Sequence, residues 1–295
     1  MTDRELIAII QKANKPSDLF TGDDWKKLYR DYCKLIHPDY HPDSLAADAM
    51  AKMNYFKDVL ENGTKYVDET GEFRVFEKKI EYVVTDANRK IISKSVSNYN
   101  LLMSKHDKAS ESFHRYLPES MVLETDRLTI NLKDRSVPLT GQKLEQNHVN
   151  WLFSRMFEFV LWLRQINYSH MGLNPTTVFV VPETHGIVVI SFYHMNVLYK
   201  KADTISDKYK LWYPTTLFTQ KVATPDIDLE LCKKIALYLL GDRSAAGTKL
   251  KKDKNVNQDV LTFLLTKHEN HVDEFKQYRE ILSKNFEKKF YVLSL

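Results

Sequence analysis

The sequence predicts an α+β protein in which a small all-helical domain precedes a larger domain with a sheet lobe and a helical lobe. Apolar residues recur at helical spacing up to residue 62, short β-branched segments separated by turns follow from Phe73, and helical spacing returns from Asn147. A chain of 295 residues also fits about two domains. We place the helical domain at residues 1–63 and the second domain at 68–295, with the sheet lobe near 68–143 and the helical lobe near 144–295.

Composition argues against several classes of protein. The net charge is +4 with both signs scattered, whereas nucleic-acid-binding domains concentrate basic residues in a patch or stripe. Cys33 and Cys232 lie in helical patterns, so we expect buried thiols and no disulfide, which fits a reducing cytoplasm. The sequence has no signal-peptide pattern and no apolar run long enough for a bilayer. We therefore expect a soluble cytoplasmic protein that binds neither nucleic acid nor membrane and carries no cofactor.

Three helices are predicted in the first domain. A short amphipathic helix covers Asp3–Ala13, and a basic one runs from Asp24 to Ile36, with Asp23 and Asp24 suited to its N-terminus. Pro38 cannot continue that helix, so it should end beside His37. A third helix covers Ala46–Leu60, and Gly63 follows as a stop signal.

The end of the basic helix carries a family resemblance. Tyr29-Arg30, followed by His37-Pro38-Asp39, resembles the second helix and loop of a DnaJ-type J-domain. The third helix is similar to that family's third helix at Met50, Met53, Asn54, Val59 and Leu60. The family's usual opening is absent, Tyr40 replaces its usual Lys, and a second tripeptide, His41-Pro42-Asp43, follows at a spacing that does not match. We therefore favour the first tripeptide.

The resemblance implies a partner and a set of contact residues. The partner is a DnaK-type chaperone of the heat-shock seventy-kilodalton class, whose ATP hydrolysis the tripeptide would trigger. The implied chaperone-binding residues are Tyr29 and the basic Lys27, Arg30 and Lys34, with His37, Pro38 and Asp39. Two simpler interpretations remain open. His-Pro-Asp is a common turn tripeptide, and the basic residues could form an ordinary solvated helix face.

A metal site at the paired tripeptides is not expected. Two histidines four residues apart suit zinc on a helix, but Pro38 and Pro42 prevent a helix there.

The second domain begins with a predicted antiparallel sheet and one packed helix. The five segments predicted as strands are 73–76, 80–84, 90–94, 121–124 and 128–132, with a helix at 101–116. A long apolar helix follows from Asn147. After it we expect strands at 178–181 and 187–191 and helices at 226–240, 259–265 and 272–284.

This arrangement resembles a protein kinase with degenerate motifs. The family's His-Arg-Asp-Leu-Lys-Pro-Glu-Asn is similar to the segment from His170 to Thr177, where Gly172 replaces the Asp base, Asn174 the Lys and Thr177 the metal-binding Asn. Ser191 begins the counterpart of Asp-Phe-Gly. Phosphoryl transfer needs magnesium-binding carboxylates and a base near the attacking hydroxyl. The resemblance therefore implies a pseudokinase with no catalysis of its own.

Two further residues complete the predicted degenerate pocket. Lys94 is a weak counterpart of the family's strand lysine, and Glu111 is its possible partner. The open alternative is an unrelated α+β domain in which Lys94 is a strand-edge lysine and His170 a hydrogen-bonded core histidine.

Together these features predict a J-domain co-chaperone that is not an enzyme. It would recruit and stimulate a DnaK-type chaperone, and its kinase-like domain would bind an unknown client or partner. Two alternatives stay open: an atypical kinase or nucleotide-binding protein relying on Lys94 and Glu111, and a non-catalytic interaction module with a decayed J-domain.

Overall fold

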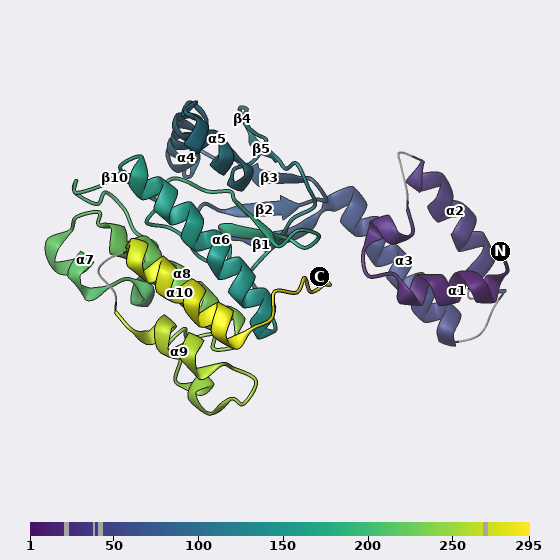
Figure 1. Cartoon of the computed structure of the whole chain (residues 1–295). Helices are drawn as coiled ribbons and strands as arrows, with labels where there is room; N and C mark the ends of the chain where they lie inside the picture. The colour runs from purple at the N-terminus through teal and green to yellow at the C-terminus, as the bar shows by residue number, and fades with distance from the viewer. Residues whose placement is uncertain (21–23, 38, 41–43, 268–270) are drawn as a thin grey trace. The chain divides into compact units, whose positions relative to one another are not determined.

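A computed structural model describes the chain apart from residues 21–23, 38, 41–43 and 268–270 (Figure 1). The chain divides into two compact units. The first comprises Met1–Tyr66 with Phe73–Glu77 and Leu295, and the second comprises Val67–Glu72 with Lys78–Ser294.

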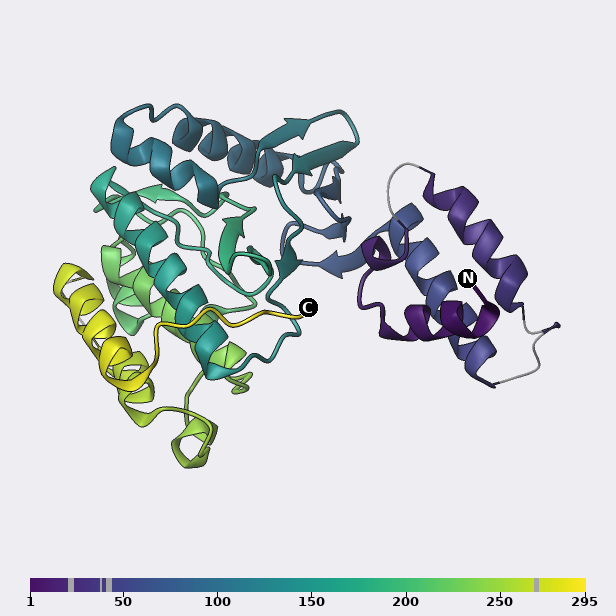
Figure 2. The same cartoon turned by 45° about the vertical axis from the view of Figure 1, so that its right-hand side comes forward.

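The first unit is built from the three predicted helices, α1 (Asp3–Lys12), α2 (Trp25–Ile36) and α3 (Ser44–Asn62). A capping box starts α1, since the Glu5 N–H donates to the Thr2 hydroxyl while the Thr2 N–H donates to the Glu5 carboxylate. Gly63, at φ +66°, follows α3 in the left-handed conformation that ends many helices. Helices α2 and α3 run antiparallel (Figures 1 and 2).

A small apolar core holds these helices together. Phe20, which follows the 3-10 turn η1 (Pro16–Asp18), is 4% exposed, and its ring lies 6.3–6.4 Å from the rings of Trp25, Tyr29 and Tyr32. The buried members of the core are Leu6, Ile10, Ala13, Leu19, Phe20, Ile36, Ala49, Met53 and Phe56. The apolar faces that the sequence predicts for these helices thus pack against one another.

A five-stranded sheet follows in the order β1-β2-β3-β5-β4. Its strands are β1 (Thr64–Val67), β2 (Glu72–Val75), β3 (Lys79–Val83), β4 (Ser120–Leu123) and β5 (Arg127–Asn131). Strand β5 pairs antiparallel with both β3 and β4, and Ile130 lies opposite Ile80. Side chains alternate between buried and partly exposed along β3 and β5, as expected for a sheet with one covered face.

One predicted strand is wrong. Residues 90–94 belong to helix α4 (Arg89–Met103), and β1 supplies the strand that the sequence assigned to them. The β-branched pair Ile91-Ile92 suggested a strand, but the buried positions Ile92, Ser95, Tyr99 and Leu102 follow helical spacing.

The predicted helix 101–116 is also divided. It comprises the end of α4, helix α5 (Lys108–Phe113) and the 3-10 turn η2 (His114–Tyr116). Asp107 caps α5 by accepting a hydrogen bond from the Ser110 N–H.

The remainder of the second unit is mainly helical. The long helix α6 (Gln146–Gln165) packs against α8 (Pro225–Leu239) and α10 (His271–Asn285), with α9 (Gln258–Leu265) next to α8 and α10 (Figure 1). The hairpin of β8 (Val178–Val181) and β9 (Gly186–Val189) follows α6 in the chain. These elements match the predicted segments to within a few residues.

Among the described residues, the elements that the sequence did not predict here are short: β6 (Val137–Pro138), β7 (Tyr168–Ser169), β10 (Asn196–Val197), α7 (Thr215–Gln220) and the 3-10 turns η3 (Lys210–Trp212) and η4 (Lys249–Lys252).

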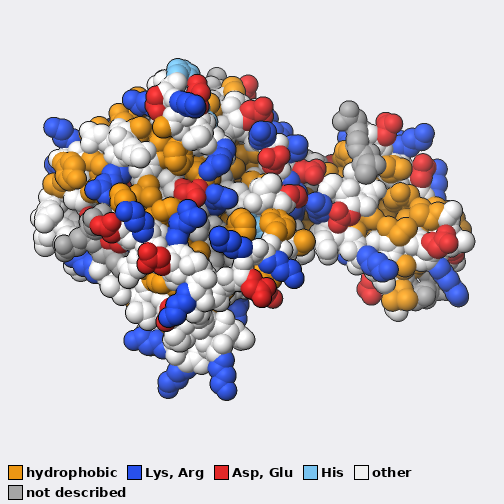
Figure 3. Space-filling view, viewed as in Figure 1, with side chains coloured by type: hydrophobic (Ala, Val, Ile, Leu, Met, Phe, Trp, Pro, Cys, Tyr) orange, Lys and Arg blue, Asp and Glu red, His pale blue; other side chains and the backbone are white. Residues whose placement is uncertain are grey.

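Both cysteines are free, as predicted, and Cys232 is fully buried whereas Cys33 is partly buried. Within the described part of the chain, no helix is both long enough and apolar enough to cross a membrane. On the face shown in Figure 3, Lys and Arg side chains are interspersed with acidic ones.

Candidate functional site

The turn after α2 brings an imidazole and a carboxylate together at the surface. His37 ends the helix in an extended conformation, the Asp39 N–H donates to its Nδ1 (3.2 Å), and the Tyr40 N–H donates to its carbonyl (2.9 Å). A carboxylate oxygen of Asp39 lies 3.4 Å from the same Nδ1, and the two side chains are 42% and 81% exposed. Pro38 and the second tripeptide, His41-Pro42-Asp43, lie outside the described residues, so the choice between the two copies stays a prediction.

The basic residues predicted for chaperone binding share one exposed side of α2. Lys27, Arg30 and Lys34 are all exposed. None of the three makes an ion pair with a carboxylate of a described residue. Their charge is therefore available to an acidic partner.

Tyr29, also predicted to bind the chaperone, lies on the packing side of α2. Its hydroxyl donates to Asn54 Oδ1 on α3 (2.6 Å), and Lys57 Nζ lies 5.7 Å from its ring centre. Burial, followed by the nearby Cys33, raises the pKa of Tyr29 to about 12. Tyr29 thus links α2 to α3.

In the second unit, a buried carboxylate on α8 holds the loop that was predicted to resemble a kinase catalytic loop. Both oxygens of the buried Asp228 on α8 accept backbone hydrogen bonds, one from His170 and one from Met171, each 2.7 Å long. His170 is 1% exposed, and burial, followed by the charge of His194, lowers its pKa to about 3. Burial raises the pKa of Asp228 to about 6. His170 is therefore neutral at physiological pH and part of the interior.

Gly172, which the sequence predicted to be the counterpart of a kinase's catalytic Asp, is fixed by packing. A Cβ at this position would lie 2.6 Å from Cδ2 of His194. Any side chain there, a carboxylate included, would have to displace that ring.

The other polar side chains of this loop hydrogen-bond within it. Asn174 Oδ1 accepts from the N–H and hydroxyl of Thr176, and its Nδ2 donates to the Gly172 carbonyl (3.1 Å). The Thr177 hydroxyl donates to the same carbonyl (3.0 Å). Asn174 and Thr177 therefore shape the loop, and neither supplies a carboxylate for magnesium.

Ser191, the predicted counterpart of a metal-binding Asp, is 6% exposed. Both backbone polar groups of the next residue hydrogen-bond to side chains of α4. The Phe192 N–H donates to Ser95 Oγ (2.9 Å), and the Asn98 amide donates to the Phe192 carbonyl (2.8 Å). The structure thus brings Ser191 near α4 with a hydroxyl in place of a charge.

Lys94 and Glu111 do not form the predicted pair. Lys94 lies on α4, not on a strand, and its Nζ is 3.1 Å from Asp203 Oδ2, while Glu111 is exposed on α5. The Lys94–Asp203 pair is itself partly exposed and is worth at most about 1 kcal/mol. The difference follows from the incorrect strand assignment of residues 90–94.

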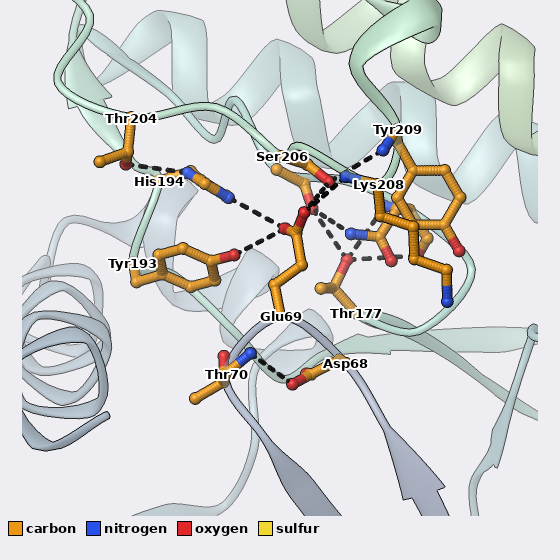
Figure 4. Close-up of polar contacts among 12 residues, drawn as sticks. Asp68, Glu69, Thr70, Thr177, Tyr193, His194, Thr204, Ser206, Lys208 and Tyr209 are labelled. Atoms are coloured by element: carbon orange, nitrogen blue, oxygen red, sulfur yellow. Dashed lines mark hydrogen bonds and ion pairs between the residues drawn. The ribbon is translucent and has the colours of Figure 1, made fainter. Parts of the chain in front are cut away.

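The most concentrated polar centre in this unit surrounds Glu69, which the sequence did not single out (Figure 4). Glu69 Oε2 accepts from the Tyr193 hydroxyl (2.8 Å) and lies 3.5 Å from His194 Nε2. Its Oε1 accepts from the Ser206 hydroxyl and from the Lys208 N–H, both at 2.8 Å. Burial by itself would raise the pKa of Glu69, but the hydrogen bonds from His194, Lys208, Ser206 and Tyr193 outweigh it and lower the pKa to about 2.

The sequence could not have revealed this centre. Glu69 sits in the turn between β1 and β2, more than a hundred residues from its partners, and no spacing rule links them. The turn sequence Asp68-Glu69-Thr70-Gly71 carried the only available signal, that of a tight loop.

A cavity of about 680 Å³ lies elsewhere in the second unit, between α6, α10 and residues 286–291. Its lining includes Trp151, Arg155, Phe275 and Arg279, and none of the residues predicted for the degenerate pocket. Among the described residues, no three His, Cys, Asp or Glu side chains gather as a metal-binding group.

Comparison with known proteins identifies no family for this chain. No family model matches the sequence, and no curated protein matches it. One similar solved structure is described as the structure of vaccinia related kinase 3, at 12% sequence identity and a TM-score of 0.48, over 78% of this chain and 95% of that one. No activity, substrate or partner follows from a similarity of this size.

Proposed function

We propose that the first unit is a J-domain-type module that recruits a DnaK-type chaperone and stimulates its ATPase. The observation that supports this most directly is the turn after α2, which presents His37 and Asp39 together at one end of an antiparallel helix pair. The side chains are exposed, while hydrogen bonds within the turn orient them.

The charge on α2 suits this role. Lys27, Arg30 and Lys34 form an exposed basic face without ion pairs to described carboxylates. An unpaired basic face steers encounters with an acidic surface and raises the association rate, an effect that salt weakens. The face would guide docking, and the His37–Asp39 turn would make the specific contact.

We propose that the second unit is a non-catalytic, kinase-like domain that binds a client or partner. Its antiparallel strands β3, β4 and β5, its long helix and the following hairpin occur in the order that the sequence predicted. At the positions that would serve phosphoryl transfer stand Gly172, Thr177 and Ser191, and none of them has a carboxylate.

The deciding experiment is single-turnover ATP hydrolysis by a bacterial DnaK with this protein added. Wild type should accelerate hydrolysis, and His37→Gln should abolish the acceleration. His41→Gln is the matched control in the second tripeptide and should leave the acceleration of hydrolysis intact. Loss with His41→Gln but not with His37→Gln would transfer the role to the second copy.

The basic face is tested in the same assay. Arg30→Ala should weaken stimulation, and more so at low salt, whereas Lys12→Ala removes an exposed charge from α1 and should have no effect. A wild-type protein that is folded but does not stimulate the chaperone would contradict the co-chaperone proposal and favour a pure interaction module.

A further inference from the structure

Two of the four groups that surround Glu69, Ser206 and His194, are also held in place by contacts that do not involve Glu69. The Tyr209 N–H donates to Ser206 Oγ (3.2 Å), and the Ser206 N–H donates to the Tyr213 hydroxyl (3.0 Å). On the other side, His194 Nδ1 lies 2.9 Å from Thr204 Oγ1, which directs Nε2 of the same ring toward the carboxylate (Figure 4). Ser206 and His194 would therefore keep their orientation if Glu69 moved away.

The turn that presents Glu69 is also shaped independently. Asp68 Oδ1 accepts from the N–H groups of Thr70 (2.7 Å) and Gly71 (3.1 Å), and Asp68 Oδ2 accepts from the Tyr82 hydroxyl (2.7 Å). Glu69 makes no contribution to these bonds. The Glu69 carboxylate is thus presented to its donors by a turn whose shape does not depend on it.

We propose that Tyr193, His194, Ser206 and the Lys208 N–H form an oxyanion-binding site that Glu69 occupies from within the chain. Fixed donors aimed at two oxygens of one anion are the arrangement that binds phosphate groups and carboxylates elsewhere. An external phosphate-class anion would compete with Glu69 for these donors. It could not bind beside Glu69, because two anions would then share a partly buried pocket.

Competition predicts that anion binding and the position of the β1–β2 turn are linked. When Glu69 is in the pocket, it joins the turn to the segment from Tyr193 to Lys208. An anion that takes its place would release the turn while keeping the pocket donors bonded. The site would thus sense phosphate-class ligands through the release of the turn.

The test uses the full chain with Glu69→Ala, which empties the pocket. Its melting temperature should fall below that of wild type and rise saturably with inorganic phosphate. By calorimetric titration, phosphate should bind Glu69→Ala at least about tenfold more tightly than wild type. Glu124→Ala removes an exposed carboxylate after β4 and should respond like wild type.

Ser206→Ala in the Glu69→Ala background should abolish the phosphate response, because it removes one of the donors to the anion. Acetate separates the two sources of an oxyanion: stabilisation by acetate and not by phosphate would overturn the assignment to phosphate-class ligands. If Glu69→Ala does not fold alone, phosphate should restore its circular dichroism spectrum. A variant that gains neither stability nor structure from phosphate would overturn the proposal.

Discussion

Replacing Gly172 with alanine tests whether packing keeps a side chain out of position 172, which the sequence predicted to be the counterpart of a kinase's catalytic Asp. A Cβ at Gly172 would lie 2.6 Å from Cδ2 and 3.1 Å from Cβ of His194. The ring of His194 is buried, with Nδ1 beside Thr204 and Nε2 beside Glu69. The ring therefore cannot move aside without losing its contacts with Thr204 and Glu69.

The expected cost follows from these contacts. Forcing an extra methyl group into a packed interior costs about 1–3 kcal/mol. We expect the upper half of this range, because the displaced ring also gives up its hydrogen bond with Thr204, worth about 1 kcal/mol, and its contact with Glu69. For a domain of roughly 150–250 residues, each kcal/mol lowers the melting temperature by about 2–4 °C, so Gly172→Ala should lower it by about 4–12 °C.

Scanning calorimetry of the full chain measures this shift, and a double-mutant cycle with His194→Ala identifies its cause. Removing the ring should relieve the clash, so that Gly172→Ala costs at least about 1 kcal/mol less in the His194→Ala background. Gly141→Ala is the control: no atom lies within 4 Å of its added Cβ, and its φ of +82° confines the cost to the backbone. An equal cost for Gly172→Ala in both backgrounds would refute the argument from packing.

Three further predictions concern single side chains. Glu69 has its pKa lowered to about 2 from an ordinary 4.5, so denaturant titrations should show wild type losing stability relative to Glu69→Gln as the pH falls from about 4.5 toward 2, with a constant difference above that window. A difference that does not change with pH would contradict the assignment. Tyr29→Phe removes the hydrogen bond to Asn54 and should lower the free energy of unfolding, measured by denaturant titration, by about 0.5–1.5 kcal/mol. Magnesium-ATP should not raise the melting temperature of wild type or Lys94→Ala, and a rise that Lys94→Ala abolishes would contradict the proposal of a non-catalytic second unit.

Much of the fold could be predicted because it depends on local sequence patterns. The helices of the first unit follow from apolar spacing, and Gly63 marks the end of α3 where its positive φ is required. The long helix α6 is likewise recognisable from its continuous apolar faces. The strand prediction at residues 90–94 fails because β-branched residues, which favour strands, occur there in a helix whose buried positions follow helical spacing.

The candidate sites also differ in whether they depend on local sequence or on tertiary packing. The turn at His37 and Asp39 depends on residues adjacent in the chain, and the sequence pointed to it directly. The contacts of Lys94 with Asp203 and of Glu69 with Ser206 join residues more than a hundred positions apart. Such pairs depend on tertiary packing, which no short motif encodes.

Gly172 and the residues around Glu69 are joined by a continuous set of contacts. Gly172 is required by the ring of His194, that ring is oriented by Thr204 toward Glu69, and Glu69 in turn accepts hydrogen bonds from Ser206. Restoring a carboxylate at position 172 would displace His194 and disturb the Glu69 centre before any metal could bind. A carboxylate base at position 172 would therefore require coordinated changes at His194 and at the residues that orient its ring.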